Sequence, residues 1–150
     1  MTSRLLSALL LATIPALGCG GAPADVRHKI AWFHENANAG RYAEITREAV
    51  WVTDLETFMQ RRQALGRMIR STEAAVDDVS GYFRVMTVHQ NTEFERGHAL
   101  ETFHFRIDEK GLRLSSYYYY VGKRFWCPAI TLSRHQCEIE DAPAPLSAAR

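Results

Sequence analysis

Three side chains in the second half of the chain have the chemistry of a small acid–base site. Residues 98–107 alternate as a β-strand does, and Glu101 falls on the same side as its apolar members. The expected cross-strand neighbours of Glu101 are His89 and Tyr118. A carboxyl group in apolar surroundings has a raised pKa, which suits a general base, and a tyrosine hydroxyl can stabilise an oxyanion. His89, Glu101 and Tyr118 therefore form a candidate pocket.

The pairing across the turn at residues 108–111 supports the predicted position of Tyr118 opposite Glu101. When Ile107 lies opposite Leu112, the apolar positions of both strands share one face. In that register Glu101 faces Tyr118. In the run of four tyrosines, the alternation then sends residues 118 and 120 inward and residues 117 and 119 outward.

The pairing with the preceding strand has two solutions. A loop that places Thr92 opposite His98 brings His89 beside Glu101. A slip by one residue brings Gln90 to that face instead, because adjacent side chains of a strand point to opposite faces. Both registers stay open at this point.

The candidate pocket also has a purely structural interpretation. Glu101 and Tyr118 can satisfy each other as a buried hydrogen bond, or Glu101 can be solvated near the mouth of the fold. We favour this interpretation over ligand recognition, and ligand recognition over catalysis.

Other chemical motifs are missing from the sequence. It contains no glycine-rich phosphate loop, no nucleophile elbow and no Cys–His pair. No metal or cofactor is expected, since the other histidines lack ligand spacing and are interpreted as ordinary surface or strand residues: His28, His34, His98, His104 and His135. A net charge of +1 over 150 residues excludes a strongly basic nucleic-acid binder.

The elements that position these side chains begin with helices. Residues 25–39 have apolar side chains at helical spacing, with Asp25 as the expected N-cap and Gly40 at the end. A second helix is expected over residues 41–49. A capping box at residues 53–56 opens a third, which places Met59 and Leu65 on one face. Its arginines, Arg61, Arg62 and Arg67, are expected on a solvated face, with lipid phosphates or cell-wall carboxylates as the alternative partners.

Strands follow the helices. Residues 83–91, 98–107 and 112–121 alternate clearly, and residues 72–79 form a weaker fourth run. Helices first and an antiparallel meander afterwards predict an α+β domain, with the helices packed on one face of a curved sheet.

The N-terminus has the features of an export signal. One positive charge at Arg4 precedes an almost purely apolar run at residues 5–14, shorter than the about 20 residues that a spanning helix needs. Small residues then lead into Cys19. This arrangement resembles the lipobox of bacterial lipoproteins, in which the peptidase cuts before the cysteine and acyl chains are attached to it. A general secretory signal cleaved near Gly18 is the alternative.

The lipoprotein resemblance implies a location. Acyl chains contribute about 0.8 kcal/mol per buried CH₂ and would hold the protein on the membrane. Removal of residues 1–18 takes Arg4 away and leaves equal numbers of basic and acidic residues. Gly20, and not Asp, follows Cys19, which in the family's sorting rule implies the outer membrane, facing the periplasm.

The two remaining cysteines are Cys127 and Cys137. In an exported protein they are expected to form a disulfide, which would stabilise the domain by roughly 3 kcal/mol. Free thiols and a metal site that includes His135 are the alternatives. The metal site is disfavoured because its spacing matches no common zinc site. The expected divisions are a signal peptide at residues 1–18, a lipidated cysteine and flexible tether at 19–25, one domain at 26–140 and a disordered tail at 141–150.

A second resemblance concerns the domain. The order of the helices, the phrase at residues 39–43 and the hairpin at residues 93–103 resemble small exported bacterial domains similar to the nuclear-transport-factor-2-like, or cystatin-like, α+β cone. The resemblance covers roughly residues 26–121. It implies a concave sheet face and a pocket, with no fixed activity.

We therefore expect a lipid-anchored cell-envelope protein that is not an enzyme and that binds an envelope protein or a small ligand. The alternative function is a small-molecule binding protein or enzyme that uses the pocket around Glu101, His89 and Tyr118.

Overall fold

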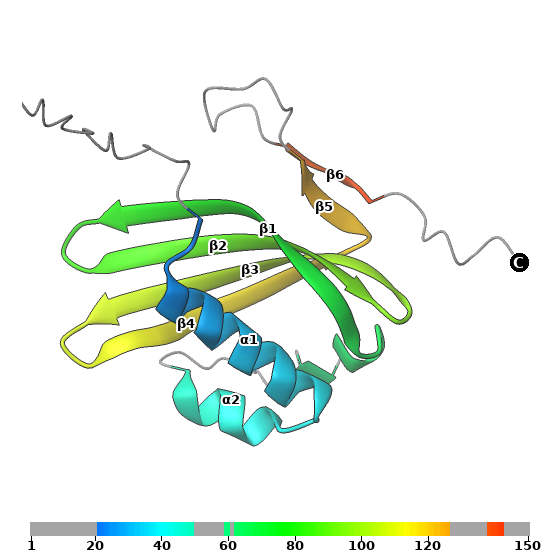
Figure 1. Cartoon of the computed structure of the whole chain (residues 1–150), viewed down its shortest axis with the longest axis horizontal. Helices are drawn as coiled ribbons and strands as arrows, with labels where there is room; N and C mark the ends of the chain where they lie inside the picture. The colour runs from blue at the N-terminus through cyan, green and yellow to red at the C-terminus, as the bar shows by residue number, and fades with distance from the viewer. Residues whose placement is uncertain (1–20, 50–58, 61, 127–137, 143–150) are drawn as a thin grey trace, which may run out of the picture.

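The computed structural model describes residues 21–49, 59–60, 62–126 and 138–142. Within these residues the elements follow the order α1 (Ala24–Asn38), α2 (Tyr42–Glu48), β1 (Met68–Ser80), β2 (Arg84–Phe94), β3 (Gly97–Asp108), β4 (Gly111–Val121), β5 (Lys123–Trp126) and β6 (Glu138–Asp141), so that helices precede strands (Figure 1). This is the α+β class that the sequence predicts.

Helix α1 forms where apolar residues recur at helical spacing. Val26, Ile30 and Phe33 are buried on one face of it. The N-cap is Pro23 and not Asp25, so the helix begins two residues earlier than expected from the predicted cap. Gly40, with φ of 70°, follows the helix in the left-handed conformation that ends many helices.

The residues just before α1 belong to the fold. Ala22 is fully buried, and its N–H lies 3.1 Å from both carboxylate oxygens of Glu73 in β1. A side chain on Gly21 would come within 2.8 Å of the same carboxylate. The expected flexible tether at residues 19–25 is therefore wrong for residues 21–25, while Cys19 lies outside the described residues.

The region of the second and third predicted helices is described in part. Helix α2 buries Ile45, as its spacing predicts. The capping box at residues 53–56 lies outside the described residues. Met59 and Leu65, on the apolar face of the predicted third helix, are both buried.

All four predicted strand runs form strands. They pair antiparallel in the order β1-β2-β3-β4. Each covers its predicted run, apart from Phe83, and extends one to four residues beyond at least one end of it. Gly111, with φ of 94°, adopts the left-handed conformation at the β3–β4 turn.

The main core contains side chains from α1 and from one face of the sheet. The ring of Phe33 lies 5.1 Å from that of Phe103 in β3 and 4.6 Å from that of Tyr117 in β4. Aromatic pairs at such distances add to the free energy gained by burying apolar area. The same face of β3 presents Glu101.

The β5–β6 hairpin contacts the opposite face. The side chain of Asn91 bonds both the N–H and the C=O of Phe125, at 2.7 and 2.8 Å. The ring of Phe125 stacks on His89 with centroids 4.9 Å apart. Strand β6 includes Asp141, which the sequence assigns to the disordered tail.

Candidate functional site

Glu101 lies in the interior of the fold. Its side chain is fully buried, because it shares the face of β3 that carries Phe103 and Phe105. The sequence predicts this inward orientation from the alternation. The partners of the carboxylate, however, are not the predicted ones.

Three donors meet the Glu101 carboxylate directly. Arg62 Nε lies 3.1 Å from Oε1, and the hydroxyl of Tyr117 donates to the same oxygen. Thr92 Oγ1 donates to Oε2 at 2.6 Å. Each of these partners is itself at least nine-tenths buried. The ion pair is therefore shielded from solvent, where charge-assisted hydrogen bonds are strong.

His34 completes the cluster from α1. Its Nδ1 lies 3.1 Å from Arg62 Nη2, and its Nε2 lies 3.4 Å from both Gln90 Oε1 and Glu101 Oε2. A guanidinium group has only donors, so Nδ1 must accept and the proton must be on Nε2. We assign His34 as the neutral Nε2–H tautomer. His34, Arg62, Gln90, Thr92, Glu101 and Tyr117 are called the inner network below.

The inner network fixes the charge of Glu101. Burial acts to raise its pKa, but the imidazole of His34 when it is protonated, the Arg62 guanidinium and the hydrogen bonds from Thr92 and Tyr117 outweigh burial and hold the pKa below its usual value. Burial, followed by the charge of Glu101, raises the pKa of Tyr117 well above its usual value, so the hydroxyl stays a donor. The expectation of a carboxyl group with a raised pKa is therefore wrong.

Tyr118 does not reach Glu101, because the β3–β4 ladder changes register. Ile107 pairs with Leu112 as predicted, but a β-bulge midway along the ladder inserts one extra residue into β4. All later pairs shift by one, and Glu101 lies opposite Tyr119.

The same shift reverses the expected orientation of the tyrosines. Tyr117 is 3% exposed, whereas Tyr118 is 41% and Tyr120 is 51% exposed. Tyr119 packs against the core. The inward tyrosines are thus residues 117 and 119, and not 118 and 120.

His89 is also absent from the network. Of the two registers considered, the structure has the one that pairs Gln90 with Glu101. His89 consequently points to the opposite face, where its Nδ1 lies 3.0 Å from Thr102 Oγ1. The structure therefore does not bring His89, Glu101 and Tyr118 together.

Arg62 and His34 are the functional residues that sequence reasoning missed. Arg62 is 2% exposed rather than solvated, and His34 is 3% exposed rather than an ordinary surface residue. Their spacing from apolar residues could have indicated their burial, since Arg62 follows Met59 by three residues and His34 follows Ile30 by four. At those separations side chains share a helix face.

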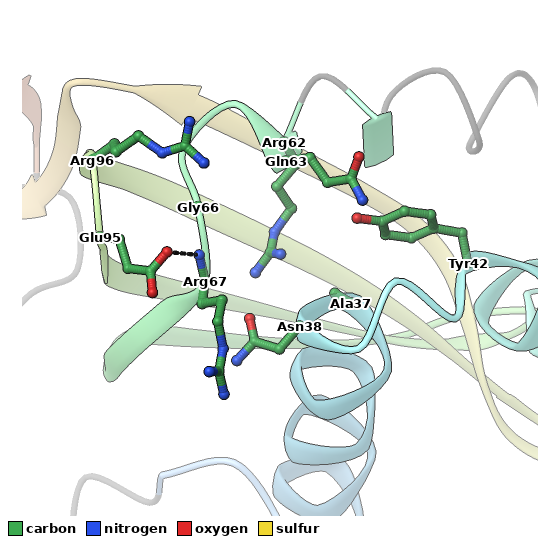
Figure 2. Close-up of a pocket in the computed structure, with 9 residues that line it drawn as sticks. All are labelled: Ala37, Asn38, Tyr42, Arg62, Gln63, Gly66, Arg67, Glu95 and Arg96. Carbon is green, nitrogen blue, oxygen red and sulfur yellow. Dashed lines mark hydrogen bonds between the residues drawn. The ribbon is translucent and has the colours of Figure 1, made fainter.

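A cavity of about 340 Å³ adjoins the inner network at the C-terminal end of α1. Figure 2 shows Arg62 at its centre, with Arg67, Glu95 and Arg96 to one side. Arg62 belongs to both the cavity lining and the network, whereas Glu101 does not line the cavity. We call this cavity, with Arg62, Arg67 and Arg96 in its lining, the arginine pocket.

The arginine pocket has an excess of positive charge. Glu95, its one lining carboxylate, accepts a hydrogen bond from the backbone N–H of Arg67 at 2.9 Å. Among the described residues, the guanidinium groups of Arg67 and Arg96 have no carboxylate partner. Guanidinium forks suit carboxylate and phosphate groups.

The described part of the chain holds no group of three or more metal-ligating side chains. None of its helices is both long and apolar enough to cross a bilayer. Comparison of the chain with family models, with curated proteins and with solved structures found no match.

Proposed function

We propose that this chain is a lipid-anchored protein of the bacterial cell envelope whose domain acts by binding and not by catalysis. The anchor rests on the apolar run at residues 5–14 and on the lipobox at Cys19. The described fold begins two residues after Cys19, at Gly21. An acylated Cys19 would therefore hold the domain directly at the membrane, on the outer membrane's periplasmic side by the family's sorting rule.

The proposal of binding and not catalysis rests on the Glu101 carboxylate, whose hydrogen-bonding capacity is already used within the protein. A general base needs an accessible carboxylate with a raised pKa. Glu101 is fully buried, and both of its oxygens already accept hydrogen bonds. A carboxylate in this state stabilises the fold and has no free oxygen to take a substrate proton.

The arginine pocket is the proposed ligand site. Its volume, about 340 Å³, lies at the lower end of the range for small-molecule sites, roughly 300–1,000 Å³. Arg67 and Arg96 would contact the ligand, while Arg62 is held by Glu101. The favoured ligand class is a small molecule that carries phosphate or carboxylate groups.

Calorimetric titration tests this ligand class. We expect citrate or inorganic phosphate to bind the full chain in detergent at low ionic strength, with affinity falling about tenfold or more when Arg67 and Arg96 are both alanine. Arg47→Ala, which removes an exposed arginine of α2 outside the pocket lining, is the matched control. Equal affinity in the double variant and the control would exclude the arginine pocket as the site.

Acyl labelling tests the anchor. The chain with native Cys19 should incorporate a labelled fatty acid and fractionate with the outer membrane, and Cys19→Ser should lose the label. Labelling that survives this substitution would refute the lipobox assignment.

We also propose the Cys127–Cys137 disulfide. Both cysteines lie outside the described residues, but Trp126 and Glu138, which flank them, are direct partners in the β5–β6 ladder. Antiparallel partners lie about 4.5–5.5 Å apart, which is close to the Cα separation of a disulfide. Alkylation of the unreduced chain should leave both cysteines unlabelled, and labelling of both would contradict the bridge.

For the fold, we propose that the helices pack on a curved sheet as in the nuclear-transport-factor-2-like cone. The contact of Phe33 in α1 with Phe103 in β3 supports this packing. An experimental structure tests it, and a flat sheet or helices away from its face would contradict it.

A further inference from the structure

The end of the sheet farthest from the arginine pocket exposes apolar side chains. Tyr82 is 95% exposed, Phe83 is 42% and Val79 is 64% exposed. All three lie at or beside the β1–β2 turn. Tyrosine and phenylalanine at a protruding turn suit a membrane interface, where one side of the ring meets acyl chains and the other meets headgroups.

A cationic cavity of about 480 Å³ lies behind this turn. Its lining includes four basic side chains and two carboxylates: Arg84, Arg106, Lys110, Arg113, Asp108 and Glu109. The guanidinium carbon of Arg106 lies 3.6 Å from the centre of the Phe83 ring. Aromatic and basic groups thus share one surface, as at protein sites that meet phospholipid headgroups.

The ion pairs in this cavity leave cationic groups available. Asp108 is shared by two arginines, Arg106 at 3.0 Å and Arg113. Lys110 has no carboxylate partner among the described residues. Arg84 is paired with Asp78 at 2.6 Å. The four basic side chains therefore exceed the three carboxylates, Asp78, Asp108 and Glu109, by one charge, and a net positive surface favours phosphate groups.

The described chain begins beside β1, the strand that leads to this turn. Ala22 is bonded to Glu73, and the three residues from Cys19 to Ala22 can span at most about 10 Å. From Glu73, the seven residues of β1 up to Ser80 cover about 23 Å. The N-terminal end of α1 and the β1–β2 turn lie at the same end of the sheet (Figure 1). An anchor that precedes α1 and the exposed turn can therefore face one membrane surface.

We propose that this end of the domain docks on the phospholipid bilayer, with Tyr82 and Phe83 in the interface and Lys110 and its neighbouring arginines at the phosphates. The inference rests on the lipid anchor proposed above. Its consequence is an orientation, because the β2–β3 turn with Glu95 and Arg96 lies at the opposite end of antiparallel strands. The arginine pocket would then open away from the membrane, towards soluble ligands.

Fluorescence quenching tests the docking in vesicles. The acylated chain, which begins at Cys19, is reconstituted into phosphatidylglycerol vesicles whose acyl chains carry bromine, which quenches tryptophan at the membrane. The variant Tyr82→Trp reports on the turn. Tyr120→Trp is the control, because it places tryptophan at another exposed tyrosine, near the other end of the sheet. The native tryptophans contribute equally to both.

We expect the added fluorescence of Tyr82→Trp to be quenched at least about twofold more than that of Tyr120→Trp. Lys110→Glu in the Tyr82→Trp background should reduce this difference, since it reverses a charge at the phosphates. Equal quenching in a chain that floats with the vesicles would overturn the docking alone. A chain that carries no acyl label and does not float would overturn both the anchor and the docking.

Discussion

Glu101 carries its charge in the core of the molecule, where an unpaired carboxylate is several kcal/mol less stable than in water. Arg62 balances that charge at 3.1 Å, and neutral donors add a further hydrogen bond to each oxygen, Tyr117 to Oε1 and Thr92 to Oε2. The charge can therefore stay buried only while all partners remain. This dependence makes single substitutions in the inner network more damaging than their contacts alone suggest.

Titration of a single residue, His34, should make the stability of the domain depend on pH. Burial is the main cause of its pKa falling below 6.5, so the unfolded chain binds more protons than the folded chain just below that pH. The free energy of unfolding should fall from about pH 7 to about pH 5. Urea denaturation at each pH measures this slope.

His34→Gln should remove much of this slope, because glutamine does not titrate. Half-buried His89 and His104, whose pKa values burial also lowers, would retain a smaller part of it. His28→Gln, on the exposed side of the same helix, is the control and should keep the full slope. A wild-type slope in His34→Gln would show that His34 is not the titrating group.

The sequence predicts which strand side chains point inward better than it predicts which side chains they contact. Strand alternation suffices to bury Glu101, because parity depends only on neighbours in the chain. The partners Arg62 and His34 come from helical segments far from Glu101 in the chain. Arg62 precedes Glu101 by 39 residues, and His34 lies farther still. The sequence places arginine and histidine at the surface because such side chains are usually exposed. Arg62 and His34 are buried because the Glu101 carboxylate lies beside them, and the three-dimensional structure is needed to show that contact.

At the scale of elements, the β-bulge in the β3–β4 ladder decides which tyrosine joins the core. Alternation assumes a regular ladder, so it predicts the pairs near the turn correctly and every pair beyond the bulge with an error of one residue. The β2–β3 register depends likewise on turn length. Apolar residues occur at both parities in β2, including Val85 and Val88, and for that reason the sequence leaves the choice open.

Neighbouring tyrosines of β4 provide a test of this register. Tyr117→Phe removes a hydroxyl that bonds both Glu101 and Arg62, and should lower the free energy of unfolding by about 1–3 kcal/mol. Tyr118→Phe removes an exposed hydroxyl and should change it by less than about 0.5 kcal/mol. Thermal or urea unfolding compares them, and a larger loss in Tyr118→Phe would refute the assigned register.

At the scale of the whole molecule, the inner network connects most of the domain. His34 lies in α1, Arg62 in the helical segment before β1, Thr92 in β2, Glu101 in β3 and Tyr117 in β4. Loss of one member therefore weakens contacts between several elements at once, and the domain should unfold as one cooperative unit. The proposed functional surfaces lie at the two ends of the sheet, with the membrane contact at one end and the arginine pocket at the other.

A double-mutant cycle on Arg62 and Glu101 tests most directly whether the buried carboxylate builds the core. In urea unfolding, Arg62→Met and Glu101→Gln should each cost about 3–5 kcal/mol, since each leaves a buried polar partner unmatched. The double variant should cost at least about 2 kcal/mol less than the sum of the two. The exposed pair Arg70–Glu93 is the control, with a coupling under about 1 kcal/mol. Additive effects, or full stability in Glu101→Gln, would contradict a structural role and restore Glu101 as a candidate for chemistry.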